Sequence, residues 1–233
     1  MTTQANLSEK ILKNWKKTKT VFNYQEAQDW VLKGPTSEDA SDLLKWATEH
    51  PFLKTKKTEI PPSVIPDCKA SIIDISVNPP RRRKGMRILD DEIFDAFPLV
   101  RTYVPRGFSI MEVEKEGATV AEHQVVIFAI KKFTGGPGDD DDQEDVLEEG
   151  TEEMEEVKTR WQHYFIEPVS SAATLLETSK ENGEAAHLGQ FRYNDKIYYV
   201  FGSKTVHLIA TKVEDIALYA GGRFEYANSI AQS

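Results

Sequence analysis

The sequence contains one cysteine, Cys68, and no apolar run long enough to span a bilayer. A single cysteine excludes a disulfide framework and favours a reducing compartment. The first residues, MTTQANLSEKILKNWKK, are polar from the start and lack the apolar core of a secretory signal. We therefore expect an intracellular protein, cytoplasmic or nuclear, that is not embedded in a membrane.

One stretch lacks basic residues altogether. Residues 139–156, DDDDQEDVLEEGTEEMEE, carry 12 acidic groups and account for much of the net charge of −9. The remaining chain has 26 acidic and 29 basic residues, so the rest of the protein is slightly basic. The pI of 5.2 therefore does not argue against an anionic partner such as nucleic acid.

What is present suits a folded protein of one large domain or two small ones, with 39% hydrophobic residues among 233. Residues 1–53 are predicted to form a helical region. Helical spacing of apolar residues, with capping residues before and Gly34-Pro35 or Pro51 after, predicts helices over 8–18, 23–33 and 37–49. Trp15, Trp30 and Trp46 are expected to be core residues of this region.

Residues 54–69 are rich in lysine and proline and are expected to form a linker. The β-branched stretch ASIIDISV, at 70–77, predicts a strand that opens a second domain over 70–233. After it comes NPPRRRKG, a compact basic loop that is a candidate contact for RNA phosphates or a nuclear address. Its basic residues are Arg81, Arg82, Arg83 and Lys84.

The middle of the chain predicts a helix over 88–98, ended by Pro98, and then two strands joined by a turn near Glu116-Gly117. Residues 134–156 open with Gly-Gly-Pro-Gly and continue into the acidic tract. Low hydrophobicity and like charge favour a disordered insertion there.

The region around Lys180 carries the strongest functional pattern. Lys180 follows a strand-like apolar segment, AATLL, and precedes Glu181 and the turn pair Asn182-Gly183. The stretch HLGQFRYNDKIYYVFGSKTVHLIA then predicts a hairpin centred on Asn194-Asp195. A short helix around 213–219 is expected to follow, and the segment after Gly221-Gly222 looks like the start of another element.

Four stretches in this order, PRGFSIMEV, IKKFTGG, SKENGEAAH and VFGSK, resemble the nucleotidyltransferase motifs of ATP-dependent ligases, and those of the phage-type RNA ligases in particular. The resemblance covers about residues 85–210. It implies that Lys180 is the adenylated nucleophile, and it assigns nucleotide-binding roles to Arg106, Lys132, Glu181, Gly183 and Lys204. Lys131 could take the place of Lys132 in this comparison.

The activity that the resemblance implies is RNA ligation with ATP and Mg²⁺, acting on 5′-phosphate and 3′-hydroxyl RNA ends. The lysine amine attacks the α-phosphorus of ATP, the AMP passes to the 5′-phosphate, and the 3′-hydroxyl displaces it. Attack needs a neutral amine, so the pKa of Lys180 has to fall below its ordinary value of about 10.4. Neighbouring cations such as Arg106 and Lys204 lower an amine pKa and also neutralise phosphate oxygens.

The sequence departs from the family after Lys204, because the expected Glu-Gly and Lys-x-Lys stretches are missing. The Phe-Glu-Tyr context of Glu225 is a weak substitute. Three explanations stay open: part of a longer ligase, a degenerate relative that binds nucleotide or RNA without ligating, or a protein-interaction module. The expected fold class is α+β, with a helical N-terminal region and a largely antiparallel, nucleotidyltransferase-like sheet interrupted by the acidic insertion.

Overall fold

The computed structural model describes residues 36–79, 90–131, 168–176 and 183–233. These residues form an α+β fold with two antiparallel sheets, which confirms the predicted class. One sheet has the strand order β1-β2-β3-β4, and the other has the order β5-β6-β7. The helices predicted over 8–18 and 23–33, with Trp15 and Trp30, lie outside the described residues, as does the predicted disordered insertion.

Helix α3 (Ser37–Glu49) has the bounds that its sequence predicts. It begins at a capping box: the Thr36 hydroxyl accepts a hydrogen bond from the Asp39 amide, and the Asp39 carboxylate accepts one from the Thr36 amide. Its apolar side is buried, and Trp46 is a core residue as expected. The helix ends at His50, immediately before Pro51.

The four-stranded sheet consists of β1 (Leu53–Glu59), β2 (Lys69–Val77), β3 (Phe108–Glu114) and β4 (Glu122–Phe128). The predicted linker over 54–69 is wrong in its first part, because β1 occupies it. Lysines in β1 obscured the strand, yet charged side chains are common on edge strands, and β1 is an edge strand. Lys57 reaches across β2 and forms an ion pair with Glu112 on β3.

Two short helices follow β2: α4 (Asp90–Ala96) and α5 (Pro98–Tyr103). The sequence predicted one helix ended by Pro98, whereas Pro98 begins the second helix. Proline suits the first position of a helix, because its missing N–H has no partner there in any case. The two strands predicted next are confirmed as β3 and β4, with Gly117 at positive φ in the turn between them.

The three-stranded sheet consists of β5 (His187–Tyr193), β6 (Lys196–Ser203) and β7 (Val206–Ala210). The predicted hairpin turn is confirmed: Asn194 and Asp195 have φ values of 46° and 60°, as in a type I′ turn. Beyond β7 lie the 3₁₀ helices η3 (Val213–Leu218) and η4 (Gly222–Phe224) and helix α7 (Glu225–Gln232). The short helix expected around 213–219 is thus present in 3₁₀ form.

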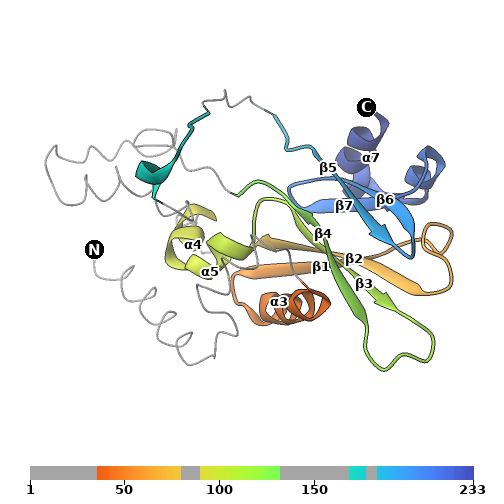
Figure 1. Cartoon of the computed structure of the whole chain (residues 1–233). Coiled ribbons are helices and arrows are strands. Elements are labelled where there is room, and N and C mark those ends of the chain that lie inside the picture. Colours follow the sequence, from red (N-terminus) through yellow and green to blue (C-terminus); the bar gives the residue numbers. More distant parts are fainter. Residues whose placement is uncertain (1–35, 80–89, 132–167, 177–182) are drawn as a thin grey trace, which may run out of the picture.

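The elements form stacked layers (Figure 1). Helices α3, α4 and α5 pack on one face of the four-stranded sheet through an aromatic-rich core. The opposite face of that sheet packs on the three-stranded sheet. Helix α7 packs on the outer face of β6 and β7, and η3 packs on β7. Because β2 and β3 lie in the middle of these layers, both of their faces are buried.

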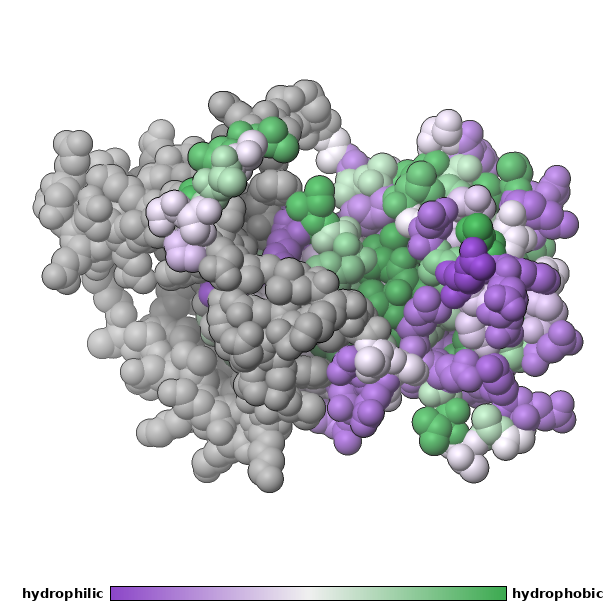
Figure 2. Space-filling model, in the orientation of Figure 1, coloured by the Kyte–Doolittle hydropathy of each residue, from purple (hydrophilic) through white to green (hydrophobic). Residues whose placement is uncertain are grey.

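Hydrophobic and hydrophilic residues occupy different parts of the surface. Figure 2 shows hydrophobic residues gathered near the middle of this face and hydrophilic residues along its right-hand edge. Several apolar side chains of the three-stranded sheet are exposed, among them Leu188 and Ile197. Helix α7 and η3 therefore cover β7 and part of β6, and they leave Leu188 and Ile197 exposed.

Candidate functional site

Three strand ends meet where the two sheets come together. Gly107 precedes β3, and its carbonyl accepts a hydrogen bond from the Ala129 amide just past β4. His187 begins β5, and its ring lies against Gly107, where a Cβ would come within 2.0 Å of an imidazole carbon. His187 also pairs in register with Gly202 near the end of β6. Residues far apart in sequence thus converge at this end.

Arg106, immediately before Gly107, is a predicted nucleotide-binding residue. Its side chain is partly buried, and Nε has no hydrogen-bond partner among the described residues. A buried guanidinium nitrogen without a partner is costly in a folded protein. Arg106 therefore retains donor capacity for an acceptor such as a phosphate oxygen.

Lys204, a second predicted residue, lies in the turn between β6 and β7. Its Nζ lies 2.9 Å from Asp90 Oδ2 at the start of α4. Both side chains are partly exposed, so the pair holds the lysine near the sheet end without burying its charge. Gly202, two residues earlier, serves a different purpose, because it makes room for the ring of His207.

Lys131 is described, whereas Lys132 lies outside the described residues. Lys131 is half-buried just past β4, and burial, with a smaller contribution from the nearby Arg101 guanidinium, lowers its pKa. It makes no ion pair with a described acidic residue. Of the two lysines weighed from sequence, Lys131 is the one for which the structure gives an environment suited to an anion.

Gly183 is the remaining predicted residue that the structure describes. It has a φ of 150° and open space where a Cβ would lie, so the chain enters β5 from an exposed, glycine-dependent turn. Lys180, Glu181 and the basic loop Arg81, Arg82, Arg83 and Lys84 lie outside the described residues. The structure therefore describes Arg106 next to Gly107, Lys131 just past β4 and Lys204 in the turn after β6, and does not describe the nucleophile.

The strand expected before Lys180 is absent. Residues 172–176 follow the short 3₁₀ helix η2 (Val169–Ser171) without regular secondary structure, and Leu175 and Leu176 are exposed. A short apolar run becomes a strand only when a neighbouring strand and a core accept it. Neither is available to these residues within the described part of the chain.

A polar cluster that the sequence analysis did not single out is buried close to this end. Asp74 of β2 lies directly opposite Ser109 of β3, and both face His207 of β7 across the interface between the sheets. His207 Nδ1 lies 2.9 Å from Asp74 Oδ1 and 2.8 Å from Ser109 Oγ. Ser109 Oγ in turn donates to Asp74 Oδ1 over 2.9 Å.

Arg223 completes the neutralisation of Asp74. Its Nη2 donates to Asp74 Oδ2 over 2.7 Å, and its Nη1 donates to Thr58 Oγ1 over 2.8 Å. Asp74 therefore accepts hydrogen bonds on both oxygens from residues of three other elements. A carboxylate buried among apolar residues persists only with such partners.

Serine, histidine and aspartate together raise the question of nucleophilic catalysis. In a catalytic triad the serine and the aspartate occupy opposite nitrogens of the imidazole. Here Asp74 and Ser109 both face Nδ1 of His207, and the other nitrogen, Nε2, lies 3.0 Å from His187 Nδ1. Ser109 is also completely buried. The cluster is therefore a connection between the sheets rather than a hydrolytic site.

One sequence signal for this cluster existed. Asp74 is the single charged residue inside the apolar run of β2, and a buried carboxylate needs partners that the local sequence does not provide. The partners come from 35, 133 and 149 positions away along the chain. Only the tertiary structure identifies them.

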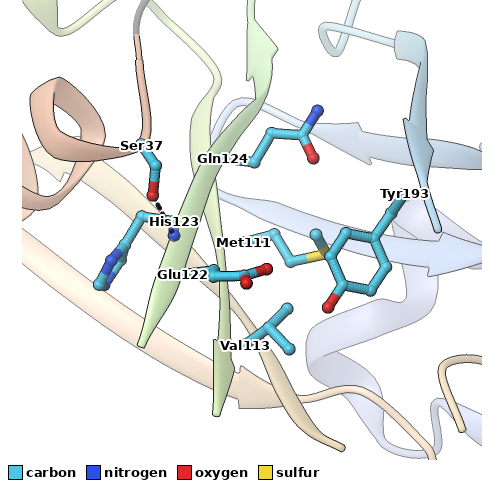
Figure 3. Close-up of a pocket in the computed structure, with 7 residues that line it drawn as sticks. All are labelled: Ser37, Met111, Val113, Glu122, His123, Gln124 and Tyr193. Atoms are coloured by element: carbon cyan, nitrogen blue, oxygen red, sulfur yellow. Dashed lines mark hydrogen bonds between the residues drawn. The ribbon is translucent and has the colours of Figure 1, made fainter. Parts of the chain in front are cut away.

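A separate pocket of about 130 Å³ lies beside β3, β4 and the end of β5 (Figure 3). Met111, Val113 and Tyr193 provide apolar walls, and Glu122 and Gln124 add polar groups. None of the residues predicted from sequence lines it. It is too small for a nucleotide, so it does not compete with the sheet end as a nucleotide site.

Within the described ranges, no group of three or more histidine, cysteine, aspartate and glutamate side chains is arranged to hold a metal ion. The same residues contain no helix that is long and apolar enough to cross a membrane. No protein-family model matches the sequence, and the searches of curated proteins and of solved structures also found no match.

Proposed function

We propose that the chain is an ATP-dependent RNA ligase, or part of one, that forms a covalent adenylate on Lys180. The observation that carries the proposal is convergence. Arg106, Lys204 and the approach to β5 come from separate motifs, yet they belong to strand ends that meet around Gly107. Lys180 precedes Gly183 by three residues, so the proposed nucleophile belongs to the segment that enters this place.

The proposed reaction begins with a bond between Lys180 Nζ and the α-phosphorus of ATP. The bond from that phosphorus to pyrophosphate breaks, and the amine loses its proton to solvent. In the second step an oxygen of the RNA 5′-phosphate displaces the lysine, which regains a proton. The 3′-hydroxyl oxygen then attacks the 5′-phosphorus, expels AMP and closes the strand.

The cations at the sheet end suit this chemistry. Arg106 retains an unpartnered nitrogen, and Lys131 is half-buried without a described acidic partner, so both are available for phosphate oxygens. Positive charge held in place before the reaction stabilises charge that develops on the phosphoryl group. Neighbouring cations also favour a neutral lysine amine.

The side chains described at the sheet end are cationic hydrogen-bond donors, which suit a triphosphate better than a bare divalent cation. Mg²⁺ usually keeps several waters and binds through one or two carboxylates together with the substrate's phosphates. When bound, it would neutralise phosphate charge. We assign no Mg²⁺ ligand among the described residues. A nucleotidyltransferase-like sheet, which the sequence motifs predict, belongs to the same proposal.

The test is covalent labelling. The protein is incubated with ATP labelled at the α-phosphate and Mg²⁺, then denatured, and acid-labile label on the protein is measured. We expect label on the unsubstituted chain and none on Lys180→Ala. Lys196→Ala is the matched control, because Lys196 is an exposed lysine at the start of β6, at the opposite end of that strand from Gly202, and it should keep full labelling.

Two results would contradict the proposal: no label on the unsubstituted protein, or equal label on Lys180→Ala. RNA or protein binding that is retained without labelling would instead support the interaction-module alternative. Arg106→Gln should reduce labelling while leaving the fold intact, because its Nε makes no described hydrogen bond.

A further inference from the structure

The imidazole rings of His187 and His207 stack on each other at the interface between the two sheets. Residues His187, Gly202 and His207 occupy one cross-strand row of the three-stranded sheet. The histidine rings lie nearly parallel, at 14° with centroids 5.3 Å apart. A Cβ on Gly202 would approach the His207 ring to 2.2 Å, and one on Gly107 would approach the His187 ring to 2.0 Å. Two glycines thus leave room for two rings.

The protons of His207 are constrained by its surroundings. An ionised carboxylate only accepts hydrogen bonds, so the Nδ1 atom that lies 2.9 Å from Asp74 carries a hydrogen. Arg223 donates to the other oxygen of the same carboxylate. With the hydrogen on Nδ1 facing Asp74, His207 presents Nε2 to His187.

The contact between the rings needs one bare nitrogen. His187 Nδ1 and His207 Nε2 are 3.0 Å apart, so one donates while the other accepts. With one proton more than the neutral pair, the contact is still a hydrogen bond. With both rings charged, two N–H groups would point at each other, and two positive charges would stack in a half-buried place.

The groups that face the pair offer little compensation for a second charge. His187 faces His207, the backbone of Ser203 and Gly107, and none of these is an acid. His207 faces Asp74, Ser109 and His187. Asp74 already forms an ion pair with Arg223, so a charged His207 would share the one carboxylate in the cluster with that arginine.

We propose that Asp74, His207 and His187 form a proton-sensitive clasp that joins the two sheets and opens when both imidazoles become charged. Opening would release the start of β5 from Gly107, next to Arg106. The clasp would operate whether or not the chain ligates RNA.

The pKa of His187 is consistent with a clasp that opens at low pH. Burial, and then the neighbouring His207, lower it below the ordinary value of 6.5, and a hydrogen bond with the Ser203 backbone opposes them. The unfolded or opened state therefore binds a proton more readily than the closed state. The clasp stabilises the interface above about pH 6.5 and loses that contribution as the pH falls through the lower pKa of the closed form.

Hydrogen exchange of the whole chain tests the clasp. Protection factors, which remove the intrinsic effect of pH on exchange, are compared at pH 7.5 and pH 5 for amides of β5 and of β1. We expect protection in β5 to fall severalfold at pH 5, because the opened state takes up the proton that the closed state resists, while β1 changes less. In His187→Gln, which can still hydrogen-bond but does not titrate, the fall should disappear.

His123→Gln is the matched control, because His123 pairs with Glu112 on the four-stranded sheet and should leave the fall unchanged. An equal fall in His187→Gln, or no fall in the unsubstituted chain, would overturn the clasp. If His187→Gln does not fold, a titration of the histidine rings by nuclear magnetic resonance decides the matter. His187 should then titrate below pH 6.5, and titration at or above that value would overturn the clasp equally.

Discussion

Strands β2 and β3 have two buried faces, and the two faces are built in different ways. One face packs under α3, α4 and α5 through apolar and aromatic side chains such as Ile75, Phe108 and Ile110. The other packs on the second sheet, and there Asp74 and Ser109 interrupt the apolar residues. Alternation along a strand allows one segment to build both interfaces.

The two faces therefore depend on different forces. Burial of apolar area is non-directional and tolerates small shifts of the partner layer. The hydrogen bonds of Asp74 hold only at one separation and one register of the sheets, because each partner must lie within about 3 Å. The helix layer adds stability, and the polar face fixes how the two sheets are aligned.

The largest effect is expected when Asp74 is replaced. Asp74→Ala leaves Arg223 and His207 without their buried partner, and breaking a buried ion pair costs about 3–5 kcal/mol. Urea unfolding at pH 7.5 measures the loss. Leu43→Ala is the control from the helix-covered face, where truncating a fully buried leucine costs about 2–5 kcal/mol.

The stability losses of the two variants should differ more in their dependence on pH than in their size at pH 7.5. Loss of Leu43 leaves every titrating group in place, so its cost should be similar at pH 7.5 and pH 5. Loss of Asp74 frees the His207 ring that faces His187, and burial and His207 lower the pKa of His187, so the cost should change over that range. Parallel behaviour of the two variants would show that the distinction between the faces is wrong.

A smaller effect concerns His50, a titrating residue buried under the helix-covered face. Burial lowers its pKa from 6.5 to about 4. Its Nδ1 accepts a hydrogen bond from the Phe52 amide, which a proton would break. Stability is therefore highest above pH 6.5 and falls toward pH 4, by on the order of 1–2 kcal/mol.

Unfolding of His50→Gln across the same pH range checks this expectation. Glutamine can accept the Phe52 hydrogen bond but does not titrate, so the slope of stability against pH should flatten. An unchanged slope would assign the acid sensitivity to other groups, His187 among them.

The smallest effect is expected at Lys204. Its ion pair with Asp90 is partly exposed, and such pairs contribute about 0–1 kcal/mol. Lys204→Met should therefore change thermal stability very little. If the same variant also reduces labelling by ATP, the loss reports a functional role; a large loss of stability would show that the lysine is structural.

Much of the fold could be predicted because its signals are local. The Asn194-Asp195 turn, the capped helix over 37–49 and the β-branched run of β2 each depend on residues a few positions apart. Strand β1 was missed because its lysines and threonines resemble a linker, and it becomes a strand only by pairing with β2. The strand predicted at 172–176 is wrong because none of the described strands pairs with these residues.

The candidate site was predictable only in part. The order of motifs predicted Arg106 and Lys204 as site residues, and the strand ends next to them lie around Gly107, while their roles stay a prediction. Sequence could not foresee that Lys204 pairs with Asp90, or that Asp74 meets His207, because those contacts depend on the stacking of two sheets. Lys180 remains a prediction.

Gly202 carries a consequence for how such a protein can change over time. It has no positive φ that would demand glycine, yet a Cβ there would meet the His207 ring at 2.2 Å and the Val206 carbonyl oxygen at 2.3 Å. A smaller residue at 207 would remove the first obstacle and leave the second, which belongs to the backbone. Gly107, with a φ of 103°, needs glycine for its own backbone. Both glycines should therefore persist in relatives that have lost the histidines.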